Sequence, residues 1–60
     1  MFEQTRIAVL CAYRELRARG LSDCSAFASA VRLFRHRYPD IPGEDASFVV
    51  ADWIGDALER

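Results

Sequence analysis

Two short breaks in a helix-compatible sequence constrain the fold more than any other feature. The first is Gly20 with the polar residues that follow it, and the second is the segment PDIPG at 39–43. Glycine commonly ends a helix because it adopts the left-handed conformation without a steric penalty, and proline cannot continue one. The second break is too short to separate two domains. Because no run alternates as a strand would, the sequence predicts an all-α fold, a compact three-helix domain in which residues 1–60 form one unit.

The first predicted helix spans about residues 2–19 and carries apolar residues on two sides. The side expected to face the core consists of Phe2, Val9, Ala12, Tyr13 and Leu16. At helical spacing Ile7, Cys11 and Ala18 project from nearly the opposite side, with Leu10 between the two sides. Either another part of the same chain covers this second side or another molecule does. The sequence leaves both alternatives open.

The second predicted helix begins at Ser22 or Asp23, which suit the capping position, and ends before Pro39. The side expected to face the core recurs at intervals of three and four residues and consists of Cys24, Phe27, Ala30, Val31, Phe34 and Tyr38. The opposite side carries the polar residues Ser25, Ser29, Arg32 and His36, with Arg35 on one flank. This polar side should face solvent or a partner.

The third predicted helix begins at Glu44 and Asp45, whose carboxylates suit the positive end of the helix dipole. Its wide apolar arc consists of Ala46, Val49, Val50, Trp53, Ile54, Ala57 and Leu58, and Phe48, Ala51 and Gly55 extend the apolar surface further. A glycine at an exposed helical position costs about 1 kcal/mol relative to alanine. Gly55 therefore either lets another helix approach closely or is simply tolerated near the end of the helix.

The three patterns together predict both a core and a contact surface. The predicted core includes Val9, Tyr13, Leu16, Phe27, Val31, Phe34, Val50, Trp53, Ile54 and Leu58. A domain of this length buries only about 60% of the surface that its unfolded chain exposes, so its core is marginal. We therefore expect the remaining apolar residues to contact a second molecule, with a homodimer as the first candidate. The predicted partner-binding residues are Ile7, Leu10, Cys11, Phe48, Ala51 and Gly55.

Charge is segregated along the chain. Residues 14–37 contain six arginines and two acidic residues, a net charge of +4, whereas residues 40–60 contain six acidic residues and one arginine, a net charge of −5. The basic part can bind nucleic acid, meet the acidic helix across a seam within or between molecules, or face only water. A nucleic-acid surface would use Arg14, Arg17, Arg19, Ser25, Ser29, Arg32, Arg35 and His36.

Two observations weigh against the nucleic-acid alternative. Domains that bind nucleic acid on their own are usually strongly basic, with a pI above about 9, whereas this chain has a pI of about 5.7. A helix-turn-helix also needs a small residue about four positions before its turn glycine, and Leu16 stands there. We therefore place nucleic-acid binding second to protein interaction.

Catalysis, cofactors and membranes find little support in the sequence. The one histidine, His36, lies between Arg35 and Arg37, and Cys11 and Cys24 lack the spacing of a zinc or redox motif. No phosphate-binding or dinucleotide-binding motif occurs, and no apolar run is long enough to cross a bilayer. We expect no enzymatic activity, no metal, no cofactor and no small-molecule substrate. The absence of a signal-peptide pattern and of a disulfide framework predicts a soluble protein of a reducing, bacterial-type cytoplasm.

Overall fold

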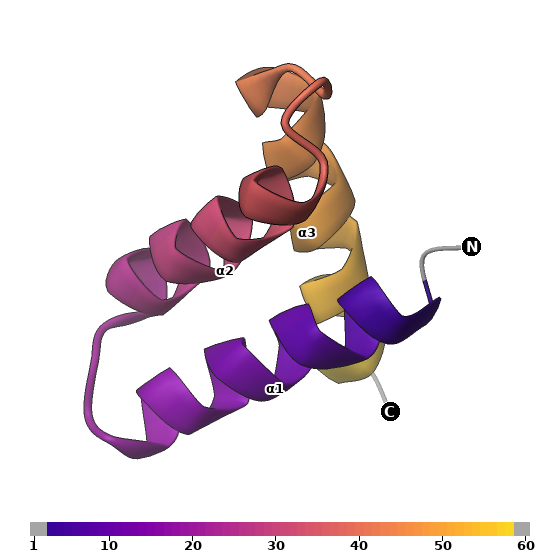
Figure 1. The fold of residues 1–60 in the computed structure, drawn as a ribbon. Helices are drawn as coiled ribbons and strands as arrows, with labels where there is room; N and C mark the ends of the chain where they lie inside the picture. The colour runs from indigo at the N-terminus through magenta and orange to yellow at the C-terminus, as the bar shows by residue number, and fades with distance from the viewer. Residues whose placement is uncertain (1–2, 59–60) are drawn as a thin grey trace.

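The computed structural model describes residues 3–58, and these form three α-helices without any strand (Figure 1). The helices are α1 (Glu3–Ala18), α2 (Asp23–Arg37) and α3 (Gly43–Leu58). The first two form an antiparallel hairpin, and α3 crosses that hairpin (Figure 1). The predicted all-α, three-helix fold is therefore confirmed. Phe2, which the sequence assigns to the first helix, lies outside the described residues.

The break between α1 and α2 is made by hydrogen bonds that its residues are suited to form. Gly20 has a φ of 98°, and its amide donates to the carbonyl of Arg17 at 3.0 Å. The amide of Leu21 donates to the carbonyl of Leu16 at 3.1 Å. This pair of bonds is the Schellman pattern, which satisfies carbonyls at the end of a helix. Ser22 then starts α2, because its hydroxyl accepts a hydrogen bond from the amide of Ser25.

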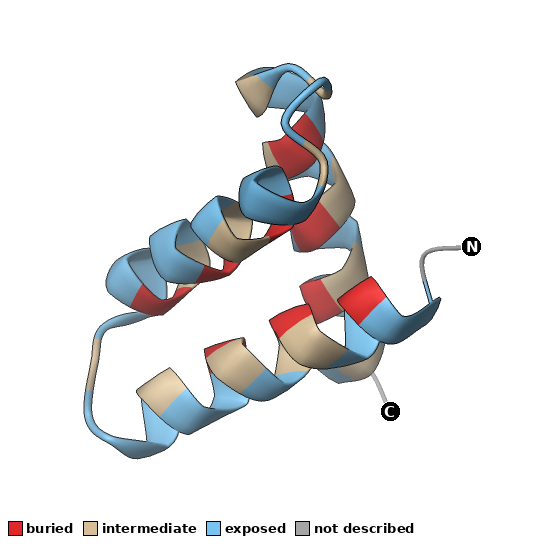
Figure 2. Ribbon diagram, viewed as in Figure 1, coloured by how far each residue is buried: buried red, intermediate tan, exposed pale blue. Residues whose placement is uncertain are grey.

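The core lies where the three helices meet (Figure 2). Its buried apolar residues are Val9, Tyr13, Ala26, Ala30, Phe34, Ala46, Val50 and Ile54. Phe34 is fully buried, and its ring centroid lies 5.3 Å from that of Tyr38 and 5.5 Å from that of Trp53. Thr5 is the one buried polar residue in the described part of the chain, and its hydroxyl lies within hydrogen-bond distance of the Tyr38 hydroxyl, at 3.2 Å.

Most of the predicted core is confirmed, and two assignments are wrong. Leu16, Phe27, Val31 and Trp53 pack against the core while only half-buried. Leu58 is 70% exposed, because it lies in the last turn of α3, where neither neighbouring helix covers it. Cys24 is also exposed, because α2 turns a different side to the core.

The rotation of α2 follows from its alanines. Ala26 and Ala30 are fully buried and lie four residues apart, so they form one side of the helix with Phe34. Small side chains let a neighbouring helix approach closely, so the part of α2 that is most buried is centred on these alanines. The sequence pattern, judged by the larger apolar residues, placed that centre closer to Phe27 and Val31, which are only half-buried.

The three helix pairs do not pack equally. The contact between α1 and α2 is the largest, that between α2 and α3 is smaller, and that between α1 and α3 is the smallest. The side of α3 that neither neighbour covers therefore remains open to solvent. No helix within residues 3–58 has the length and apolar character that crossing a membrane requires.

Candidate interaction surface

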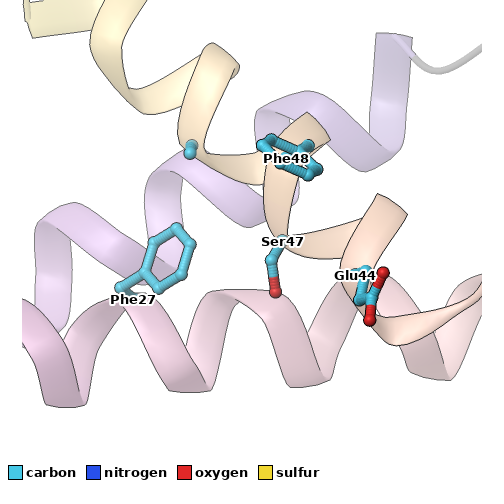
Figure 3. A pocket seen from close by; sticks show the side chains of 5 residues that line it. Phe27, Glu44, Ser47 and Phe48 are labelled. Atoms are coloured by element: carbon cyan, nitrogen blue, oxygen red, sulfur yellow. The ribbon is translucent and has the colours of Figure 1, made fainter.

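An open depression of about 540 Å³ lies between α2 and α3. It is lined by Phe27 of α2 and by Glu44, Ser47, Phe48 and Ala51 of α3. Figure 3 shows Phe27 extending from α2 towards α3, and it shows Phe48 on α3. Phe48 is 77% exposed, which is the largest exposure among the bulky apolar side chains in the described residues. Burying an aromatic ring of this size is a major source of binding energy at protein interfaces.

A second depression continues the first towards the C-terminal end of α3. The two share Phe27 and Ala51, and the second adds Ile54, Gly55 and Leu58 of α3. Tyr13 of α1 and Asp23 of α2 complete its lining. We call the two depressions together the α3 groove. Its lining comes from all three helices and is mainly apolar.

The α3 groove contains a regular apolar seam. Phe48, Ala51, Gly55 and Leu58 follow one another at intervals of three, four and three residues, the spacing at which one helix packs against another. All four are exposed. A Cβ added at Gly55 would meet no atom of a neighbouring helix or loop within 4 Å, so packing against the rest of the described chain does not require glycine there. The sequence missed Leu58 and Phe27 as surface residues because both fit the expected core pattern, although the seam spacing of Leu58 was available as a signal.

The charges around the α3 groove are acidic. Asp23 and Glu44 line it, and no basic residue lines either depression. Asp52 is exposed, next to Ala51 and four residues after Phe48, which places it beside the groove. The groove therefore combines an apolar floor with a negative rim.

The predicted partner-binding residues divide between two surfaces. Phe48, Ala51 and Gly55 lie in the α3 groove, as described above. Ile7, which is 56% exposed, and Cys11 lie on the side of α1 opposite its buried residues. Leu10 belongs fully to neither surface, because it is half-buried and packs against the core. The expectation that Leu10 projects from an unused side is therefore corrected.

The predicted nucleic-acid residues are all exposed, and they spread from the end of α1 along most of the length of α2. Because α1 and α2 are antiparallel, the arginines at the end of α1 lie beside the start of α2, and the guanidinium of Arg17 donates to the carbonyl of Leu21 at 3.0 Å. Arg35 lies twelve residues further along α2 than Asp23, which is roughly 18 Å at 1.5 Å per residue. All eight residues of this set are exposed, namely Arg14, Arg17, Arg19, Ser25, Ser29, Arg32, Arg35 and His36.

No ion pair in residues 3–58 joins α2 to α3, so the predicted charged seam is not formed within the molecule. The ion pair that the described chain does form is local, between Arg19 and Glu15 at 3.7 Å, with both side chains largely exposed. The Arg35 guanidinium instead packs over Gly43 at the start of α3, where a Cβ would lie 3.6 Å from its nearest nitrogen. The arginines of α2 thus contribute to packing at one point and otherwise face solvent.

Tyr13 and Asp23 form the polar end of the α3 groove. The Tyr13 hydroxyl donates a hydrogen bond to a carboxylate oxygen of Asp23, which ties α1 to the first turn of α2. This hydrogen bond, together with burial of the ring, raises the pKa of Tyr13 above its ordinary value of 10.0. The neutral phenol is therefore the form that stabilises the folded chain.

The raised pKa of Tyr13 predicts a loss of stability in alkali. Since the folded pKa exceeds the unfolded one, the contribution of Tyr13 is fully present below pH 10.0 and is lost as the pH rises from there through the raised value. An Asp23→Asn variant should bring the pKa back towards 10.0. The pKa of Tyr13 is measured by absorbance titration of tyrosinate, in a Tyr38→Phe background that leaves Tyr13 as the single tyrosine. An unchanged pKa in Asp23→Asn would contradict the assigned cause.

No group of His, Cys, Asp or Glu side chains in the described part of the chain is arranged to hold a metal ion. Comparisons of the chain with protein-family models, with curated proteins and with solved structures found no match. The candidate site is therefore defined by the geometry of the chain alone.

Proposed function

We propose that this protein is a small, non-catalytic protein–protein interaction module that self-associates through the α3 groove, with a homodimer as its smallest assembly. The observation that carries the proposal is the 77% exposure of Phe48 within an apolar groove. A solvated phenylalanine gains free energy when a partner covers it, at about 25 cal/mol for each Å² of apolar surface buried. The exposed seam of regular spacing gives the groove a surface against which a helix of a second molecule can pack.

The size of the molecule limits how tight this association can be. A stable interface buries about 800 Å² on each partner, which would be nearly a fifth of the 4466 Å² that this chain exposes. The described chain has three bulky apolar side chains that are exposed, namely Ile7, Phe48 and Leu58. We therefore expect a weak, reversible association that is populated at high protein concentration.

Sedimentation equilibrium over a wide concentration range tests the proposal. The unmodified protein should show a mass that rises with concentration, and Phe48→Asp should abolish the rise, because it removes the aromatic ring and adds a negative charge to an acidic rim. Ser29→Asp is the matched control: it adds the same charge to the exposed side of α2, outside the groove, and should leave association unchanged. A Kd of 1 mM corresponds to only about 4 kcal/mol, so a protein that stays monomeric up to about that concentration would refute self-association.

A further inference from the structure

Resting on the proposed self-association, we infer that the α3 groove of one molecule receives the outer face of α1 from a second molecule. The outer face of α1 is defined here by Ile7, Cys11, Arg14 and Ala18, which recur at intervals of four, three and four residues. All four are exposed. The contact is therefore head-to-tail, between two different surfaces, rather than between two copies of the groove.

Shape favours a ridge in the groove over a second groove. Ile7 and Cys11 are successive residues of one helical ridge on the side of α1 opposite its buried residues, and Ile7 also borders a depression that it shares with Gln4, Ala8 and Arg37. An amphipathic helix that lays its apolar side into an apolar groove is a recurring mode of protein recognition. Two concave surfaces placed face to face would leave a water-filled gap between them.

Charge favours the same arrangement. A groove-to-groove contact would bring the acidic rim of one molecule, including Asp23, Glu44 and Asp52, against the identical rim of its partner. Like charges placed opposite one another weaken an interface. The outer face of α1 carries the opposite charge, because Arg14 belongs to it and Arg37 of α2 lies beside Ile7.

The acidic residues on α1 do not cancel this positive charge. Glu15 lies near the outer face but forms an ion pair with Arg19. Glu3 is exposed in the first turn of α1, near the end of the ridge. The middle of the ridge, from Ile7 to Arg14, is therefore apolar and basic. Its charge is complementary to that of the acidic rim of the α3 groove.

A head-to-tail contact has a consequence for assembly. After a first contact has formed, the molecule that supplied the groove keeps its α1 face free, and the molecule that supplied the α1 face keeps its groove free. Contacts of this kind extend into chains unless the rotation between molecules closes a ring. The homodimer is then the smallest member of a series of longer chains or closed rings.

Mixing two variants tests this inference. Phe48→Asp inactivates the groove and keeps the α1 face, whereas Ile7→Asp inactivates the α1 face and keeps the groove. Each variant alone should be monomeric, with association weakened by about tenfold or more. An equimolar mixture should form a 1:1 heterodimer that grows no further, because only one competent groove and one competent α1 face are present. Sedimentation velocity and native mass spectrometry measure the species, and circular dichroism verifies that each variant is folded.

The outcomes separate the inference from the proposed function. If Ile7→Asp alone associates as the unmodified protein does, and the mixture gives no heterodimer, the α1 face is not the occupant and the inference is overturned, while groove-mediated self-association stands. If the unmodified protein is monomeric throughout, both fail. Should Ile7→Asp prove unfolded, Cys11→Asp on the same face replaces it with the same expectation.

Discussion

Replacement of Phe34 by alanine is expected to remove much or all of the domain's free energy of unfolding. Phe34 is fully buried and packs between Tyr38 and Trp53 at the centre of the core. Truncation of a buried phenylalanine to alanine costs about 3–5 kcal/mol, from lost burial and from the cavity that remains. Small domains have a free energy of unfolding of about 0.05–0.15 kcal/mol per residue, which is roughly 3–9 kcal/mol for 60 residues. The substitution therefore removes much or all of the stability.

Phe48→Ala is the matched control for this prediction. It makes the same chemical change at a position that is 77% exposed, and a surface substitution of this kind usually changes stability by less than about 0.5 kcal/mol. Urea denaturation followed by circular dichroism measures both variants, at a concentration low enough to keep them monomeric. Equal losses in the two variants would contradict the burial assigned to Phe34.

The second large effect is expected from Ala30→Leu. Ala30 is fully buried on the side of α2 that faces the core. Three added carbon atoms have no space there, so the helices must move apart or side chains must leave their preferred rotamers, at a cost of about 1–3 kcal/mol. Leucine and alanine are both good helix formers, so the loss would reflect packing and not helix propensity.

Ala28→Leu provides the comparison for Ala30→Leu. It lies two residues away on the same helix and is exposed, so the larger side chain extends into solvent at little cost. The difference in unfolding free energy between the two variants reports the packing effect directly. A stable Ala30→Leu variant would show that α2 does not present Ala30 to its neighbours.

The sequence predicted the number of helices well because the breaks between them rest on local chemistry. Gly20 adopts the positive φ that its position requires, and Ser22 caps the next helix. These effects act over a few residues and need no knowledge of the tertiary structure. The helix boundaries agree with those predicted to within two residues, apart from the terminal residues that the structure does not describe.

The side that α2 turns to the core was harder to predict, because it depends on how closely α1 approaches. Large apolar residues dominated the sequence pattern, whereas Ala26 and Ala30 form the most deeply buried part of the helix. Cys24 was placed in the core for the same reason and is exposed. Rotation of a helix about its own axis is decided by its neighbours, and a single sequence contains little information about it.

The candidate site shows the same division. Exposure of Phe48, Ala51 and Gly55 followed from their position outside the main apolar arc of α3. The contribution of Phe27 to the groove could not be predicted from the sequence, because it depends on the angle at which α2 and α3 cross. The separation of Ile7 and Cys11 from the groove likewise depends on how α1 packs, which no spacing within α1 reveals.

The unequal packing of the three helices has a consequence for how the chain folds. The most extensive contact joins α1 to α2, and these neighbours in sequence are separated by a turn of only a few residues, so forming their pair requires little loop-closure entropy. Contacts that are local in sequence form quickly. We infer that the hairpin of α1 and α2 forms the nucleus of folding, and that α3 completes the structure by docking onto this preformed platform.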